Sequence, residues 1–223
     1  MVDQPPIEIL SVDDSLLAVN KPAGLLCLPD GYQPELPHLR TLLEPTYGPL
    51  WIVHRLDKDT SGVLLLARTT AAHRTLSLQF ENRQVQKTYH ALVRGSPSWQ
   101  EKTMDAPLRS AVGRRKRTII DPHRGKPAVT HFRVLKRFSG YSLVEAIPLT
   151  GRTHQIRAHL YALGNAIVRD ALYGSLADDP TLPIQRTALH ARRISLLHPH
   201  TDRELTVTAP YPEDFAACLA SLA

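Results

Sequence analysis

A wholly apolar run, VLLLA at residues 63–67, follows directly on a dense polar stretch, HRLDKDTSG at residues 54–62. An apolar run of this length, bounded by a glycine, is typical of a buried central strand. The polar stretch therefore lies at the edge of a core element, where a rigid scaffold usually presents a functional site. Asp, Thr, Ser and Gly are also turn formers, and the spacing alone favours a plain turn before the strand.

The composition is that of a globular protein with an ordinary core. The 223 residues allow one large domain or two small ones, and 43% of them are hydrophobic. No apolar run approaches the ~20 residues of a membrane span, and the N-terminus lacks a signal-peptide pattern. The two cysteines, Cys27 and Cys218, match no metal or redox spacing. We therefore expect a cytoplasmic protein without a membrane partner.

Positive charge recurs along the chain. The formal net charge is +6 and the isoelectric point is about 9.5, which fits a polyanionic partner. The segment RSAVGRRKR at 109–117 carries five basic side chains and no acid, although a solvated loop explains that segment equally well. Further basic side chains follow at Arg133, Lys136, Arg137, Arg152, Arg157, Arg192 and Arg193. Their recurrence favours RNA or DNA over a single small anion.

The hydrophobic pattern predicts strands that outnumber helices. We expect helices from Thr69 or Thr70 to Phe80, and from about Arg152 to Leu163 with Gly164 as its cap. Residues 29–49 read as a long surface loop with one helical turn. Strands are expected at 7–10, 16–20 and 63–67, in TYHALVRG, in a hairpin of HFRVLKRF with YSLVEAI, and twice in the tail from Ile194. This order predicts an α+β fold with a mixed, mostly antiparallel central sheet, flanked by helices and loops, in a single domain over 5–223.

A second polar cluster, TGRTHQIRAH at 150–159, opens the later helix. The free N–H groups of a first helical turn can bind an anion. His154 and His159 are five residues apart and lie on different faces, which argues against a zinc pair. Arg157 follows the apolar Ile156 at the edge of the buried stripe, and a largely buried arginine needs a carboxylate partner. Glu145, another structural acid or Asp57 could supply it.

These residues together resemble the RluA-type RNA pseudouridine synthases. HRLDKDTSG carries the complete HRLDxxTSG pattern of that family's catalytic motif. Four other landmarks resemble family motifs and occur in the family's order: VNKPAGLL at 19–26, QKTYHALVRG at 86–95, TGRTHQIRAHLYALG at 150–164 and LHA at 189–191. The resemblance covers nearly the whole chain, and it favours an active site over a plain turn.

The resemblance implies an enzyme that isomerises uridine in RNA to pseudouridine. Asp57 then supplies the catalytic carboxylate, either as a nucleophile at the sugar or as a base that removes the C2′ proton. Tyr89 packs on the uracil, and Arg157 keeps Asp57 ionised. Because the reaction is an isomerisation without a redox step, no cofactor or metal is expected. Ribosomal RNA and transfer RNA are the expected partners of a monomeric enzyme.

Further residues are expected to contact RNA. Arg55 resembles the family arginine that fills the gap left when the target base is flipped. The other predicted RNA contacts are His54, Thr60, Arg114, Arg115, Arg117, Arg152, His154 and Gln155. The chain departs from the family pattern at Ala166, where Pro is usual, and at Arg169, where Gly is usual, and it keeps the Asp170, Tyr173 and Gly174 of that pattern. It begins only a few residues before its first predicted strand, so we expect no separate N-terminal S4 domain.

Two other function classes fit parts of the sequence. A glycoside hydrolase could use Asp57 and Asp59 as its acid and nucleophile, but the 6% aromatic content offers few sugar-binding rings. A catalytically inactive RNA-binding protein of the same fold would share the basic segments. The intact set of Asp57, Tyr89 and Arg157 speaks against it. Incubation with uridine-containing RNA and nucleoside analysis separates all three classes.

Overall fold

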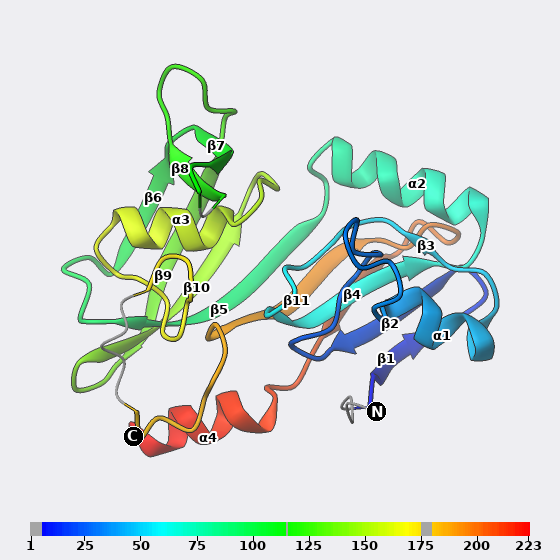
Figure 1. Cartoon of the computed structure of the whole chain (residues 1–223). Coiled ribbons are helices and arrows are strands. Elements are labelled where there is room, and N and C mark those ends of the chain that lie inside the picture. The colour runs from blue at the N-terminus through cyan, green and yellow to red at the C-terminus, as the bar shows by residue number, and fades with distance from the viewer. Residues whose placement is uncertain (1–5, 115, 175–179) are drawn as a thin grey trace. The chain divides into compact units, whose positions relative to one another are not determined.

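The computed structural model describes residues 6–114, 116–174 and 180–223 (Figure 1), and its contacts fall into two compact units. Unit 1 comprises Met1–Gln86 and Ala191–Pro210, and unit 2 comprises Lys87–His190 and Tyr211–Ala223. Each unit is therefore assembled from segments that are far apart in the sequence. The single catalytic domain over 5–223 stays a prediction.

Unit 1 is built on a sheet in which the buried strand β4 lies between β2 and β11. β1 pairs with the outer side of β2, β3 pairs with β4, and β12 pairs with β11. All seven residues of β4 are buried, as predicted for the apolar run. The strands are β1 (Glu8–Val12), β2 (Leu16–Lys21), β3 (Trp51–Ile52), β4 (Ser61–Ala67), β11 (Leu189–Leu197) and β12 (Glu204–Thr208).

Helix α2 (Thr70–Glu81) covers one face of this sheet and is seen along β4 in Figure 1. Thr69 caps the helix, because its hydroxyl accepts a hydrogen bond from Ala72 N at 3.1 Å, which confirms the predicted start. Ala72 and Leu76 pack against Val63 and Leu65 of β4 in one hydrophobic cluster. The alternate residues of β4 face the opposite side of the sheet and are buried there, so this strand is covered on both faces.

The prediction of a loop over residues 29–49 is wrong in part, because α1 (Leu39–Tyr47) is a nine-residue helix. His38 and Thr41 fix its start: Thr41 Oγ1 accepts from His38 N at 3.0 Å and donates to His38 O at 2.7 Å. Leu39 and Leu43 are buried one turn apart. The Pro and Gly content of residues 29–49 indicated a loop, but Pro45 lies in the last turn of the helix, and the chain leaves the helix at Gly48 with φ 74°.

Unit 2 contains a second antiparallel arrangement, in which β10 lies between β5 and β9, and β6 pairs with the outer side of β9. The predicted hairpin is confirmed: Phe138 N donates to Tyr141 O at 2.8 Å across the turn, where Gly140 has φ 75°. The strands are β5 (Gln86–Arg94), β6 (Glu101–Asp105), β7 (Leu108–Val112), β8 (Arg117–Ile120), β9 (Val129–Arg137) and β10 (Tyr141–Pro148). The segment RSAVGRRKR is therefore mostly a β7–β8 hairpin, which was not predicted.

Two helices complete unit 2. Helix α3 (Gln155–Ala162) contacts β9 and β10, and it begins about three residues later than predicted. It ends as expected at Gly164 (φ 77°), where Gly164 N donates to Tyr161 O and Asn165 N donates to Leu160 O, both at 3.0 Å. Helix α4 (Glu213–Ser221; Figure 1) was not predicted. Its Phe215 belongs to the same hydrophobic core as Ile156 and Leu160 of α3.

The predicted α+β class with a mostly antiparallel sheet is thus confirmed. The pairs β1–β2, β2–β4, β3–β4 and β11–β12 of unit 1 and β5–β10, β9–β10 and β6–β9 of unit 2 are antiparallel, and an isolated bridge between Leu26 and His38 is parallel. Within the described residues, none of the helices is long and apolar enough to cross a membrane.

We predict that Gly62→Ala strongly destabilises the protein. Gly62 has φ 115°, and a Cβ placed on it would lie 2.2 Å from Ala191 O in the neighbouring strand. Strain of ~1–3 kcal/mol and overpacking of ~1–3 kcal/mol should lower the free energy of unfolding in urea. Gly31→Ala is the matched control, because its added Cβ meets no atom within 4 Å and should change stability by less than ~1 kcal/mol. Equal effects of the two substitutions would contradict this view of Gly62.

Candidate active site

The loop of residues 53–60, which leads into β4, is held in place by the buried ammonium group of Lys21. Lys21, at the end of β2, is 0% exposed. Its Nζ donates to Pro22 O and Leu25 O at 2.8 Å and to Lys58 O at 2.9 Å. Gly24 N donates to the same Lys58 carbonyl at 2.9 Å. The KPAG turn and the HRLDKDTSG loop are therefore held together through backbone groups.

The buried thiol of Cys27 holds the same loop at a second place, Leu56. Cys27 Sγ donates to Leu56 O and accepts from Leu56 N, both at 3.4 Å. Burial raises the pKa of the Cys27 thiol, so the group stays protonated near neutral pH and serves as a packing residue. Leu56 is the residue directly before Asp57, so this contact fixes the backbone on the N-terminal side of the proposed catalytic carboxylate.

Asp57 lies at the turn that these contacts of Lys21 and Cys27 hold. Its side chain is half-buried, and Thr60 N donates to Asp57 O at 3.1 Å, which closes the turn. Asp59 is exposed. Arg55 is also exposed, and its side chain has no ion-pair or hydrogen-bond partner within the described residues. The stretch is thus both a turn and a scaffold that presents two differently placed carboxylates.

Two residues of this loop predicted to contact RNA have structural roles. His54 Nε2 accepts from Leu65 N of β4 at 3.0 Å, and the ring stacks on Phe80 of α2 with centroids 4.7 Å apart. Thr60 is 2% exposed. His54 ties the loop to the sheet and the helix, and Thr60 is buried, while the RNA contacts of both residues stay predictions.

Tyr89 lies in β5 of unit 2, paired with Ala146 of β10. It is half-buried and packs against the hydrophobic core of the unit. Lys87 is two residues earlier and so points to the same side of the strand. Burial lowers the pKa of Lys87, and its Nζ would lie 3.9 Å from a Cβ placed on Gly151. The sequence analysis did not single out Lys87, although its spacing from Tyr89 was a usable signal.

Arg157 is held by a buried carboxylate in its own unit. Its Nε donates to Asp170 Oδ2 at 2.7 Å and its Nη2 donates to Asp170 Oδ1 at 2.9 Å. The two side chains are 9% and 0% exposed. Asp170 Oδ1 also accepts from Leu172 N at 3.0 Å and Tyr173 N at 3.1 Å. One carboxylate therefore fixes both the guanidinium plane and the turn that follows Asp170.

The ring of Tyr173 also contacts the Arg157 guanidinium. The Arg157 Cζ lies 5.3 Å from the Tyr173 ring centroid, within cation–π range. The Tyr173 hydroxyl donates to Thr118 O at 3.0 Å and accepts from Thr118 N at 2.7 Å, which ties the ring to β8. Desolvation raises the pKa of Tyr173, so the ring stays neutral at ordinary pH.

The buried arginine and its need for a carboxylate were predicted, but Asp170 was not named as the partner. The Glu145 alternative is wrong, because Glu145 accepts from Arg133 at 2.8 Å and lies 3.8 Å from His90 Nε2. The pairing of Arg157 with Asp57, which belongs to unit 1, stays a prediction. Asp170 matched a family landmark, and that match was the signal that could have identified it.

The segment before α3 divides into structural and accessible residues. Gln155 is buried, and its amide is fully used: Oε1 accepts from Thr150 Oγ1 and Arg152 N, and Nε2 donates to Val129 O and Thr130 Oγ1. Gln155 thus has a structural role, and its RNA contact stays a prediction. Arg152 and His154 are half-buried, and His154 takes a left-handed conformation with φ 53° before the helix. The anion site was expected at a helix start near residue 152. Because α3 begins at Gln155, residue 152 does not lie at a helix start.

The arginines of the β7–β8 hairpin also differ from one another. Arg114 is exposed and has no side-chain partner within the described residues. Arg117 is half-buried, with its Cζ 5.8 Å from the Tyr161 ring and 5.6 Å from the Tyr173 ring. Arg115 lies outside the described residues, so its predicted RNA contact stays a prediction. Arg117 thus serves packing against α3 and Tyr173.

Two further expectations concern the family pattern and metals. Arg169, where the family usually has Gly, has φ 57°, so a side chain occupies a left-handed position that glycine would adopt without strain. Its Nε donates to Ile184 O at 3.2 Å.

Among the described residues, no three His, Cys, Asp or Glu side chains lie close enough together to hold a metal ion.

Comparison with known proteins agrees with this geometry. The family model described as RNA pseudouridylate synthase matches residues 15–162. The ribosomal large subunit pseudouridine synthase D of Zymomonas mobilis is 39% identical over 94% of this chain and 70% of its own length. The corresponding protein of Nitrosomonas europaea is 38% identical over 97% of this chain and 65% of its own length.

Solved structures give the same result. Human RNA pseudouridylate synthase domain containing 4 superimposes with a TM-score of 0.79 at 27% identity, covering 96% of this chain and 92% of that one. Human RNA pseudouridylate synthase domain containing 1 gives a TM-score of 0.78 at 31% identity, over 96% of this chain and 87% of that one. This chain belongs to the RNA pseudouridylate synthase family. It is accordingly an enzyme that isomerises uridine in RNA, and the hydrolase and inactive-protein alternatives are not favoured.

We predict that Asp170→Asn costs about 3–5 kcal/mol of unfolding free energy, the usual effect of stranding one member of a buried ion pair. A double-mutant cycle with Arg157→Met, followed by urea unfolding, should show strong coupling, because either single change already breaks the pair. The exposed Arg40–Glu44 pair, with side chains 44% and 31% exposed, is the control. Glu44→Gln should cost under ~1 kcal/mol. Additive effects at Asp170 and Arg157 would show that they do not interact in solution.

Proposed function

We propose that Asp57 is the catalytic carboxylate of the isomerisation and that Tyr89 and Arg157 act on the same uridine. In the reaction, the C1′–N1 bond breaks, the uracil turns, and C5 bonds to C1′. C5 loses its proton and N1 gains one, so atoms balance without an external group. Asp57 either attacks C1′ or removes the C2′ proton, and both routes need it ionised. Because no electrons are exchanged, the proposal includes no cofactor.

The contacts that hold the Arg157 guanidinium in place are the main support for this proposal. A guanidinium held by two short bonds to Asp170 and by the Tyr173 ring keeps one direction and one charge state. In the proposal, Arg157 offsets the desolvation that would otherwise raise the pKa of a carboxylate in a water-poor site. Tyr89 packs on the uracil and helps to take up the C5 proton. The bidentate hold by Asp170 ensures that Arg157 does not need to reorganise during the reaction.

The proposed substrate is structured ribosomal RNA, with transfer RNA as the second candidate. The relatives from Zymomonas mobilis and Nitrosomonas europaea are both named as enzymes of the large ribosomal subunit, which supports ribosomal RNA. We further propose that the enzyme acts as a monomer in the cytoplasm. Arg55, exposed and unpaired within the described residues, fills the gap left by the flipped base.

Of the other predicted RNA contacts, the proposal retains Arg114, which is exposed, and Arg152 and His154, which are half-buried. Arg152 Nε also donates to Pro127 O at 3.0 Å, and His154 Nδ1 lies 3.3 Å from the Tyr173 hydroxyl. Arg115 stays a prediction outside the described residues. His54, Thr60, Gln155 and Arg117 are assigned to the scaffold instead, because their side chains are buried or packed, as described above. This division separates substitutions that weaken RNA binding from those that weaken the fold.

We predict that Asp57→Asn abolishes pseudouridine formation and leaves RNA binding within a few-fold of the wild type. The amide keeps the shape of the side chain and removes only the charge that the chemistry needs. Asp59→Asn is the matched control, because Asp59 is a neighbouring exposed carboxylate and should retain most activity. Nucleoside analysis of digested RNA after incubation measures the product. The opposite behaviour of the two variants would show that Asp59 is the catalytic group.

A second pair of variants separates binding from packing in the β7–β8 hairpin. Arg114→Gln should weaken RNA binding and lower the log–log slope of affinity against salt by about 0.7–0.9, without changing stability. Arg117→Gln should lower the free energy of unfolding by ~0.5–2 kcal/mol through the lost cation–π contacts. Binding titrations at several salt concentrations and urea unfolding measure the two effects. A stability loss confined to Arg114→Gln would reverse the assignment.

A further inference from the structure

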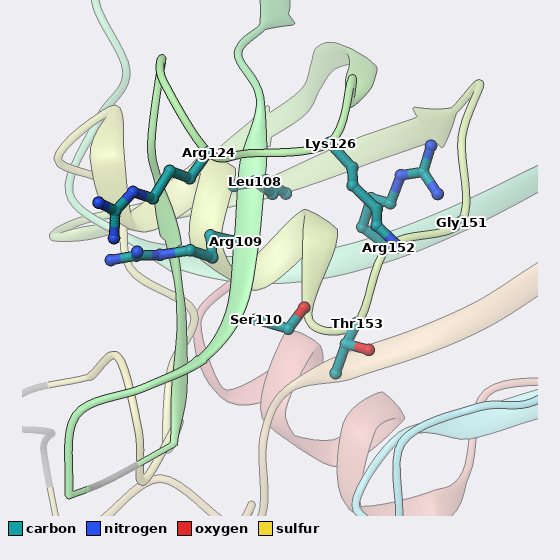
Figure 2. Close-up of a pocket in the computed structure, with 8 residues that line it drawn as sticks. All are labelled: Leu108, Arg109, Ser110, Arg124, Lys126, Gly151, Arg152 and Thr153. Atoms are coloured by element: carbon teal, nitrogen blue, oxygen red, sulfur yellow. The ribbon is translucent and has the colours of Figure 1, made fainter.

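A cavity of about 400 Å³ in unit 2 is lined by four cations and no carboxylate. Three segments form it: the start of β7, the turn at residues 124–126 and the loop before α3. Figure 2 shows Arg109 and Arg124 extending together on one side, with Lys126 and Arg152 on the other. The complete lining is Leu108, Arg109, Ser110, Arg124, Lys126, Gly151, Arg152 and Thr153. We refer to it as the basic cavity.

Asp121 lies beside this lining and is already paired. Asp121 Oδ2 lies 3.0 Å from Arg109 Nε, and its Oδ1 accepts from His123 N at 3.1 Å and Arg124 N at 2.9 Å. The hydrogen bond from Arg124 N is the main cause that lowers the pKa of Asp121, so this carboxylate stays charged and holds the turn. Arg124 and Lys126 are exposed, and within the described residues neither side chain has an ion-pair partner.

The backbone frame holds the cations in place. Leu108 N donates to Lys126 O at 2.9 Å, and Lys126 N donates to Leu108 O at 2.8 Å, so the turn is tied to β7. Gly125 permits this approach, since a Cβ there would lie 2.4 Å from Asp121 O. Arg152 Nε donates to Pro127 O at 3.0 Å, which links the loop before α3 to the same turn. The backbone that carries the four cations is therefore fixed, and the Arg109 and Arg152 side chains are held by Asp121 and by Pro127 O.

The chemistry of the lining favours a phosphate over a base. Arginine forks and a lysine ammonium are the usual partners of phosphate oxygens. The hydroxyls of Ser110 and Thr153 add neutral donors, and within the described chain neither has a protein partner. The lining contains no aromatic ring on which a base could stack, and its one large apolar side chain is Leu108.

We propose that the basic cavity binds one phosphodiester group of the RNA backbone, outside the residues assigned to the isomerisation. The proposal rests on the proposed function for its choice of polyanion. Phosphate contacts fix the register and orientation of a nucleic acid without reading its sequence. The cavity thus positions the substrate RNA, while Asp57, Tyr89 and Arg157 act on the uridine.

The first test compares two variants that lose the same charge. Arg124→Gln with Lys126→Gln empties the cavity of its two unpaired cations. Lys102→Gln with Lys136→Gln removes two exposed cations from β6 and β9 of the same unit. The probe is a fragment of large-subunit ribosomal RNA, titrated at several salt concentrations. We expect the cavity variant to bind about tenfold more weakly, with a slope lower by about 0.7–0.9 per lost phosphate, and the control to match the wild type. Equal losses in both variants would overturn the proposal.

The second test locates the phosphate on the RNA. Neutral methylphosphonate linkages are placed one at a time along the fragment. One linkage should weaken binding to the wild type and have no further effect on the cavity variant. If every linkage weakens both proteins equally, no phosphate occupies the cavity. If the cavity variant binds RNA normally but loses calorimetric binding of inorganic phosphate, the cavity is a free-phosphate site and the proposal is overturned.

The two RNA-binding tests do not require the enzyme to form pseudouridine. If the wild type forms no pseudouridine in any RNA, the proposed function fails, and the fragment still reports whether the cavity contacts a phosphodiester. If pseudouridine forms and the cavity variant keeps both affinity and salt slope, the cavity proposal fails while the proposed function stands.

Discussion

The buried ammonium of Lys21 is the interaction on which the presentation of Asp57 depends. It takes three backbone carbonyls as acceptors, one of them at Lys58, directly after Asp57. Burying a charge is costly, and a well-packed apolar side chain often stabilises a fold as well or better. A lysine here is better explained by position than by stability, because an apolar residue could not bind the carbonyls of two separate loops. The Cys27 contact with Leu56 fixes the other side of the same residue, so Asp57 sits on a backbone held from both directions.

Arg157 shows the same principle in unit 2 with a different partner. The orientation of the Arg157 guanidinium is set by the carboxylate of Asp170. Asp170 Oδ1 also accepts from Tyr173 N and so holds the turn that leads to Tyr173, whose ring lies against the guanidinium. A substitution at Asp170 is therefore expected to disturb the arginine, the turn and the link to β8 together. Such coupling explains why a residue that touches no substrate can be as sensitive to change as a catalytic one.

Local chemistry was readable from the sequence, and contacts between distant residues were not. The Thr69 cap, the hairpin at Gly140 and the Gly164 helix end each follow from a few neighbouring residues, and all three were predicted correctly. Helix α1 was missed because the Pro and Gly content of residues 29–49 indicated a loop. The family resemblance identified Asp57, Tyr89 and Arg157 as candidates. It also covered Asp170, but it did not name Asp170 as the partner of Arg157, because that pairing depends on how the chain returns after α3. Side-chain burial then decided between the structural and accessible members of each motif.

The basic charge of the chain illustrates why burial matters more than composition. Several arginines are used by the fold itself: Arg117 packs on two tyrosines, Arg137 donates to Gln100 and Trp99, and Arg186 forms a bidentate pair with Asp214. These side chains contribute to the isoelectric point but are already occupied. The cations that remain without partners in the described structure include Arg55, Arg114, Arg124 and Lys126. The proposed RNA contacts are taken from this second group, because a guanidinium that already satisfies the protein would have to abandon those contacts before it could neutralise a phosphate.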